Sequence, residues 1–118
     1  MISFLLVSLA AICNAIMDVT QFHFYRSVFN SEGFSESWWN GDISWRNKYK
    51  NGTVAQGRNS IPIWFTDAFH FFKSSMILLL CLSVVFHQEL LNWWIDLLIY
   101  GFLWNSFFKM FYKYILRK

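Results

Sequence analysis

Apolar residues are concentrated in three long segments of this chain, 2–24, 61–87 and 90–112. Each segment matches the roughly 20 mostly apolar residues that a helix needs to cross the hydrocarbon core of a bilayer. The segment 25–60 holds four of the five glycines and much of the Asn and Ser, which favours turns and irregular structure. The pattern predicts an all-α protein in which residues 1–118 form a single membrane domain of three transmembrane helices.

Polar residues interrupt each apolar segment at intervals that place them on one helix face. The pairs are Asn14 and Asp18, Asp67 and His70, and Asn105 and Lys109. Residues three or four apart share a face, and at a rise of about 1.5 Å per residue the pairs fall at similar depths in one half of the bilayer. A titratable side chain in the hydrocarbon core costs roughly 3 kcal/mol or more. The three polar stripes are therefore expected to turn inward and meet near the cytoplasmic face.

The residue types in this cluster fit acid–base or metal chemistry. A carboxylate beside a His orients the ring and raises its basicity, so Asp67, His70 and Asp18 are candidate catalytic residues. The same three side chains offer oxygen and imidazole ligands for a divalent metal, with His23 as a further candidate, although the HExxH zinc signature is absent. The candidate substrate-binding residues, of which the two cations would hold a phosphate, are Arg46, Lys73, Asn14 and Asn105.

The same cluster also has a structural explanation. Polar side chains in membrane helices commonly hold a bundle together, and Asp18 or Asp67 paired with Lys73 or Lys109 would serve. A transport or proton-relay role is a third alternative. The leading hypothesis is a small interaction or subunit protein of a membrane complex. The alternative is a compact enzyme, metal-dependent or acid–base, that acts on a lipid-like or phosphorylated substrate. Asp96 lies outside the stripes and is assigned to the outer interface without a role.

The amino-acid composition strengthens the assignment of the chain to a membrane. Hydrophobic residues make up 56% of the chain and charged residues 14%, whereas soluble domains contain about 25% charged residues. Aromatic residues reach 22%, more than a small water-soluble core can bury. The lipid bilayer is the expected partner, and three short helices bury so little surface that a homo-oligomer or a larger membrane complex is expected too. Nucleic acid is not expected, because the basic residues flank the predicted spans.

The basic residues lie on one side of the predicted spans. Segment 25–60 contains Arg26, Arg46, Lys48, Lys50 and Arg58, the C-terminal end contains Lys109, Lys113, Arg117 and Lys118, and the hairpin 87–89 contains no Lys or Arg. Cytoplasmic loops of membrane proteins are enriched in these residues. The long loop and the C-terminus are therefore expected in the cytoplasm, with the N-terminus outside.

Aromatic residues also gather in the long loop, where Trp38, Trp39, Trp45 and Tyr49 lie close together in the sequence. Amphipathic rings favour the headgroup region, so residues 34–49 are expected to lie along the membrane surface or to fold back over the helices. The first span is expected to be retained, since no Lys or Arg precedes its apolar run as in a signal peptide. Cys13 and Cys81 lie inside predicted spans and indicate no disulfide framework.

Two stretches resemble a pattern in small bacterial integral membrane proteins that have no established activity. They are the loop Ile43-Ser44-Trp45-Arg46-Asn47-Lys48-Tyr49-Lys50-Asn51-Gly52, which is similar to an SW[RK]NKYKNG motif, and the helix start Phe65-Thr66-Asp67-Ala68-Phe69-His70-Phe71-Phe72-Lys73, which is similar to a TDxxH motif. The resemblance, which extends over about half of the chain, implies a location in the bacterial inner membrane. It also implies that the loop and the Asp67/His70 pair work together at the cytoplasmic face, and it supplies no substrate.

Overall fold

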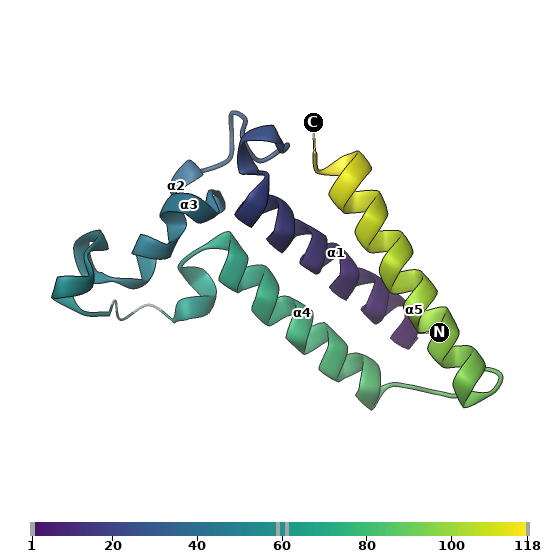
Figure 1. Ribbon diagram of the computed structural model, residues 1–118. Coiled ribbons are helices and arrows are strands. Elements are labelled where there is room, and N and C mark those ends of the chain that lie inside the picture. The colour runs from purple at the N-terminus through teal and green to yellow at the C-terminus, as the bar shows by residue number, and fades with distance from the viewer. Residues whose placement is uncertain (1, 59, 61, 118) are drawn as a thin grey trace.

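The structure, a computed structural model, describes residues 2–58, 60 and 62–117, and its regular elements in these residues are all helical (Figure 1). Three helices are long: α1 (Ile2–Phe22), α4 (Ala68–Val85) and α5 (Trp93–Lys109), the last continued by a π-helical segment, Met110–Ile115. The segment between α1 and α4 contains two short helices, α2 (Glu36–Trp39) and α3 (Gly41–Ser44). Five 3₁₀ turns complete the described elements: Phe24–Arg26, Trp45–Lys48, Lys50–Gly52, Val54–Gln56 and Ile63–Phe65. The prediction of an all-α protein is confirmed.

The second long helix begins later than the apolar pattern predicts. Residues 62–67 lie outside α4, and Ile63–Phe65 form a 3₁₀ turn instead. The helix begins after Asp67, whose extended backbone and side-chain bond to the backbone N–H of His70 form an N-cap. An Asp at this position satisfies one of the first N–H groups of a helix, which have no partner within the helix itself. The predicted start, residue 61, lies outside the described residues; the helix itself is present and begins later than predicted, at Ala68.

Helix α1 lies between the other two long helices (Figure 1). It packs along α4 and along α5, whereas α4 and α5 contact each other little, so the three helices form a layer. The molecule as a whole has extents of 53 × 32 × 20 Å. Small side chains permit this packing, because Ala10, Ala11 and Ala15 of α1 are fully buried. The hydroxyl of Ser3 donates to the carbonyl of Ser83 at 3.0 Å and ties the start of α1 to the end of α4.

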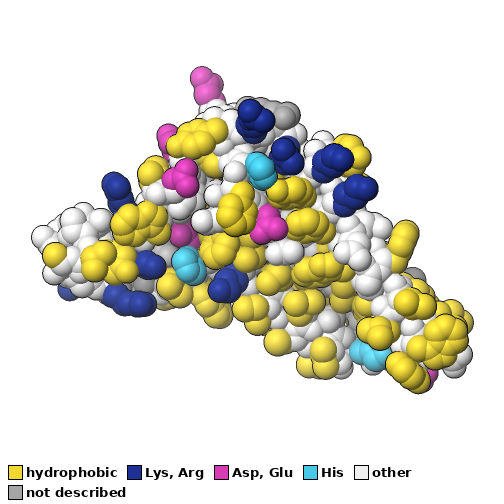
Figure 2. All heavy atoms as spheres, viewed as in Figure 1, with side chains coloured by type: hydrophobic (Ala, Val, Ile, Leu, Met, Phe, Trp, Pro, Cys, Tyr) yellow, Lys and Arg dark blue, Asp and Glu magenta, His cyan; other side chains and the backbone are white. Residues whose placement is uncertain are grey.

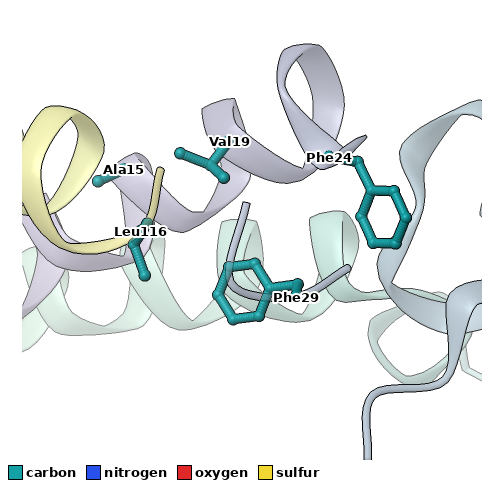
Figure 3. Packing of buried hydrophobic residues seen from close by; sticks show 5 residues of the cluster. All are labelled: Ala15, Val19, Phe24, Phe29 and Leu116. Atoms are coloured by element: carbon teal, nitrogen blue, oxygen red, sulfur yellow. The ribbon is translucent and has the colours of Figure 1, made fainter. Parts of the chain in front are cut away.

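A hydrophobic cluster closes the loop end of this layer (Figure 3). Its buried members are Ala15 and Val19 of α1, Phe24 and Phe29 of the following segment, and Leu116 beyond α5. The backbone N–H of Val28 donates to the carbonyl of Leu116 at 2.8 Å. The cluster thus joins α1, the loop and the C-terminal segment into one packed unit.

The aromatic loop folds back over the helices, which was one of its two predicted arrangements. The ring of Trp39 stacks on that of Phe29 with centroids 4.3 Å apart, and it also lies 5.8 Å from the ring of Phe72 on α4. The indole N–H of Trp38 donates to the carbonyl of Phe65 at 3.1 Å. These contacts hold α2 and α3 against the first turns of α4.

Candidate functional site

Asp67 is the centre of the candidate site and is only 3% exposed. Its Oδ1 accepts from the backbone N–H of His70 at 2.8 Å and lies 2.7 Å from Nδ1 of the same residue. Its Oδ2 accepts from the hydroxyl of Ser44 at 3.3 Å. One carboxylate therefore begins helix α4, orients the imidazole and anchors the end of α3. The three-residue spacing noted in the sequence joins an N-cap to the third residue of its helix.

The bond from Asp67 fixes what the imidazole of His70 can do. An ionised carboxylate requires a proton on Nδ1, which leaves Nε2 as the nitrogen that accepts or releases a proton. The His70 side chain is about one quarter exposed, so Nε2 is not sealed inside the protein. A histidine held in this way is suited to general acid–base work.

The loop brings Ser44 to this site by a close approach between α3 and α1. Asn40, fully buried, caps α3 by accepting from the backbone N–H of Asp42 at 3.0 Å. A Cβ at Gly41 would lie 2.9 Å from Oε1 of Gln21 and 3.0 Å from the carbonyl of Thr20. Only a residue without a side chain allows α3 to lie this close to α1. Sequence analysis did not identify these loop residues; the signal available to it was the Asn-Gly pair ahead of a short polar turn.

A cavity of about 550 Å³ opens beside the Asp67–His70 pair. Its lining residues come from α1, the loop and the start of α4: Met17, Asp18, Gln21, Phe22, Gly41, Trp45, Asp67, Phe69 and His70. The structure thus brings together the three predicted catalytic residues, Asp18, Asp67 and His70. Asp18 is half-buried, and its carboxylate has no hydrogen-bond partner among the described residues.

The predicted substrate-binding residues do not line this cavity. Arg46 and Lys73 are exposed, and the guanidinium of Arg46 lies over the Trp45 ring at 5.4 Å from its centroid. Asn14 is half-buried on α1, and Asn105 is exposed on α5. Figure 2 shows the charged side chains of this face spread over the loop end rather than gathered around one point.

Two parts of the predicted polar cluster are therefore wrong. The stripe on α5 does not turn inward, since Asn105 and Lys109 are both exposed. Within the described residues, the one ion pair is that of Asp67 and His70, so neither predicted pairing with Lys73 nor with Lys109 is formed.

The predicted metal site is not assembled either. Across the described parts of the chain, no three His, Cys, Asp or Glu side chains come together in a way that could hold a metal ion. Asp67 and His70 are adjacent, but Asp18 does not complete a set of three ligands. The ring of His23 lies against that of Tyr112, 5.5 Å away.

A second buried aspartate, Asp96, lies at the opposite end of the layer. It is 1% exposed, and its two oxygens accept from the backbone N–H groups of Leu90 at 2.9 Å and Leu91 at 3.3 Å. Nearby, Nδ1 of His87 lies 2.6 Å from the hydroxyl of Tyr100. Sequence analysis gave Asp96 no role, and this is corrected: its carboxylate holds the turn between α4 and α5.

The chain matches no protein-family model, and no curated protein or solved structure is significantly similar to it.

Proposed function

We propose that this chain is a multi-pass membrane protein that acts as a small interaction or subunit protein of a membrane complex. The observation that carries the proposal is the apolar surface of α4 and α5. Exposed side chains on these helices are Ile77, Leu78, Val84, Val85, Leu97, Leu98 and Phe102. Soluble proteins rarely expose contiguous apolar patches beyond a few hundred Å², so this surface requires lipid or another protein.

Helix α4 is the clearest span. Helices α1 and α4 are each long and apolar enough to cross a membrane, but a core helix of a soluble protein would pass the same test. Only 11% of the apolar stretch of α4 is buried, against 50% for α1. A core helix would be mostly buried, so α4 fits a bilayer better than a soluble core.

A third span is proposed for α5 together with its continuation, which run from Trp93 to Ile115. The loop between α1 and α4 lies at the same end of the layer as the C-terminus, and the N-terminus lies near the other end (Figure 1). This arrangement supports the orientation expected from the basic residues, with the N-terminus outside and the loop and C-terminus in the cytoplasm. The membrane that fits the sequence resemblance is the bacterial inner membrane.

The proposed partner is another membrane protein or a second copy of this chain. Large apolar side chains of both outer helices, α4 and α5, are exposed and not covered by the rest of the chain. Helices in lipid associate through packing and interhelical hydrogen bonds, not through hydrophobic burial. The exposed Asn105 and Ser106 on α5 offer such polar contacts, which supports an interface on that helix.

The native cysteine on α4 tests the membrane proposal directly. Cys81 is exposed at the surface of α4, so in membranes it is expected to resist a charged, impermeant maleimide and to react after SDS is added. In a background lacking Cys13 and Cys81, Gln88→Cys should react from outside intact cells, and Ser60→Cys only after permeabilisation. Rapid labelling of Cys81 in intact membranes would contradict the proposal, because it would place α4 in water.

A second candidate function is acid–base catalysis on a lipid-like substrate. The specific observation that favours it is the 2.7 Å contact between Asp67 and Nδ1 of His70 at the edge of a cavity that also contains Asp18. The test is to reconstitute the protein with bacterial polar lipids and to follow lipid composition by mass spectrometry. Conversion that is lost in His70→Ala would support the enzyme, and an unchanged lipid composition with the wild-type protein would oppose it.

A further inference from the structure

A second cavity adjoins the one beside Asp67 at the end of α1. The two share Gln21 and Phe22 in their walls, and the second has a volume of about 410 Å³. Phe22 is 71% exposed, so the boundary between the cavities lies at the surface of the protein. The two cavities therefore form one continuous surface that is a candidate binding site, called the pair of cavities below.

The first cavity of the pair has the character of a cation site. Asp18 contributes a carboxylate without a hydrogen-bond partner in the described residues, and no Lys or Arg lines the wall. The rings of Phe22, Trp45 and Phe69 lie around it. Carboxylates and aromatic faces together recognise organic ammonium groups, by charge and by cation–π attraction. Arg46 and Lys73, the candidates from the sequence for holding a phosphate, are not among the lining residues of this cavity.

The second cavity has the opposite character. Arg26 and Arg117 line it together with His23, and among the described residues Asp42 is the one carboxylate in its wall. The guanidinium of Arg117 lies over the Tyr112 ring at 5.4 Å, and its backbone is bridged to Ser27. These contacts hold Arg117 in place. Arginine in a fixed position binds phosphate oxygens through two parallel N–H bonds.

We propose that the pair of cavities binds the headgroup of a zwitterionic phospholipid with a primary amine, of the phosphatidylethanolamine type. The phosphate lies in the cavity of Arg26 and Arg117, and the ammonium group reaches Asp18 across Gln21 and Phe22. This inference rests on the proposed membrane location, in which the end of α1 lies at the level of the cytoplasmic headgroups.

The charge pattern distinguishes this ligand from its neighbours. An anionic phospholipid satisfies the arginine cavity alone and meets repulsion from Asp18. A soluble amine satisfies the acidic cavity alone. Only a ligand with both charges uses both walls, and an acyl chain attached to it has the exposed ring of Phe22 beside it.

The test is a titration of the full chain in a neutral maltoside detergent, with bound lipid counted by native mass spectrometry. The two probes are dihexanoyl phosphatidylethanolamine and dihexanoyl phosphatidylglycerol, which carry the same acyl chains and differ in the amine. The amine lipid is expected to bind about tenfold more tightly, which is the factor that one charge-assisted hydrogen bond supplies. Equal affinity for the two lipids would overturn the proposal.

Variants assign the two charges separately. Asp18→Asn should remove the preference for the amine lipid, because the amine loses its carboxylate and the glycerol lipid no longer meets repulsion. Arg117→Gln should weaken binding of both lipids. Glu32→Gln and Arg58→Gln are the matched controls, because both residues are exposed and neither lines either cavity. A preference that survives in Asp18→Asn, with circular dichroism showing an intact fold, would contradict the assignment of the ammonium site.

Free phosphoethanolamine separates the lipid from a soluble ligand of the same chemistry. It should bind at least about tenfold more weakly than the lipid, because it lacks the acyl chains that contact apolar surface. If free phosphoethanolamine bound as tightly as the lipid, the ligand would be a soluble phosphoamine, and the proposal of a lipid would be overturned. The membrane location is tested separately, by extracting membranes that contain the protein with alkaline carbonate, which leaves integral membrane proteins in the pellet. Failure of the lipid proposal is therefore distinguishable from failure of the membrane proposal.

Discussion

Asp67 and Asp96 are the two buried aspartates of this chain's described residues, and they lie at opposite ends of the helical layer. Both oxygens of Asp96 accept from backbone N–H groups, those of Leu90 and Leu91. Asp67 accepts from one backbone N–H and from two side chains, those of Ser44 and His70. A carboxylate bound by backbone alone fixes a turn. A carboxylate that also holds an imidazole at the edge of a cavity positions a group that can take part in binding or proton transfer.

The largest expected effect is at the purely structural aspartate. Asp96→Ala leaves two N–H groups without their acceptor in a buried site, and hydrogen bonds to a charged group contribute about 1.5–3 kcal/mol each. We expect the free energy of unfolding in detergent to fall by about 3 kcal/mol. Asp96→Asn is the control, because its one carbonyl oxygen keeps part of the bonding and should give a smaller loss. A loss below about 1 kcal/mol for Asp96→Ala would show that water replaces the carboxylate.

Gly41 concerns a feature in which the two aspartates differ. The close approach of α3 to α1 at Gly41 brings the Ser44 side chain to Asp67, whereas the oxygens of Asp96 accept from backbone N–H groups. Gly41→Ala places a Cβ 3.0 Å from the backbone carbonyl of Thr20, which cannot move aside as a flexible side chain can. Overpacking of this kind costs about 1–3 kcal/mol. We expect a loss of about 2 kcal/mol in the free energy of unfolding, measured by thermal denaturation in detergent.

The matched control for Gly41 is Gly101→Ala. A Cβ at Gly101, in the interior of α5, meets nothing within 4 Å. This variant should leave stability unchanged or raise it slightly, because Ala is the better helix former by about 1 kcal/mol. Equal stability of the two variants would mean that the loop is not held against α1 as the structure shows.

The third effect concerns the cap that Asp67 provides. Asp67→Ala removes the N-cap of α4 and is expected to lower the free energy of unfolding by about 1–2 kcal/mol. Asp67→Asn should lower it by less, because Asn is an equally good N-cap. Calorimetry of the two variants side by side tests this. If Asn is as damaging as Ala, the negative charge beside His70 matters more than the cap.

The sequence predicts the three long helices because their apolar runs are long, even though a few polar residues interrupt each of them. It also places Asp67 and His70 on one face, as their spacing requires. It does not predict that α4 begins at Ala68, since 61–66 are as apolar as the helix that follows and the N-cap at Asp67 is a matter of backbone geometry. A hydropathy pattern contains no information on which of several polar residues begins a helix.

The contacts between segments are the other part that could not be predicted. Ser44 meets Asp67 only because Gly41 packs on α1, a tertiary contact without a periodic signal. Asn105 and Lys109 share a helix face, as predicted, but spacing does not say whether that face turns inward or outward. Asp96 lies outside the polar stripes, so the sequence pattern assigns it no role. Its partners are backbone N–H groups, which a pattern of side chains does not reveal.

The smallest expected effect on stability, and the most informative for function, is at His70. Its side chain is partly exposed, so His70→Ala should change the free energy of unfolding by less than about 0.5 kcal/mol, whereas Asp67→Ala does more damage. His87→Ala is the matched control at the opposite end, since that ring also bonds one neighbour, Tyr100. Under the enzyme alternative, His70→Ala abolishes lipid conversion and His87→Ala does not. If His70→Ala lowered stability as much as Asp67→Ala, the imidazole would be part of the helix cap. Asp67 would then need its histidine to begin the helix, and its role would be structural, like that of Asp96.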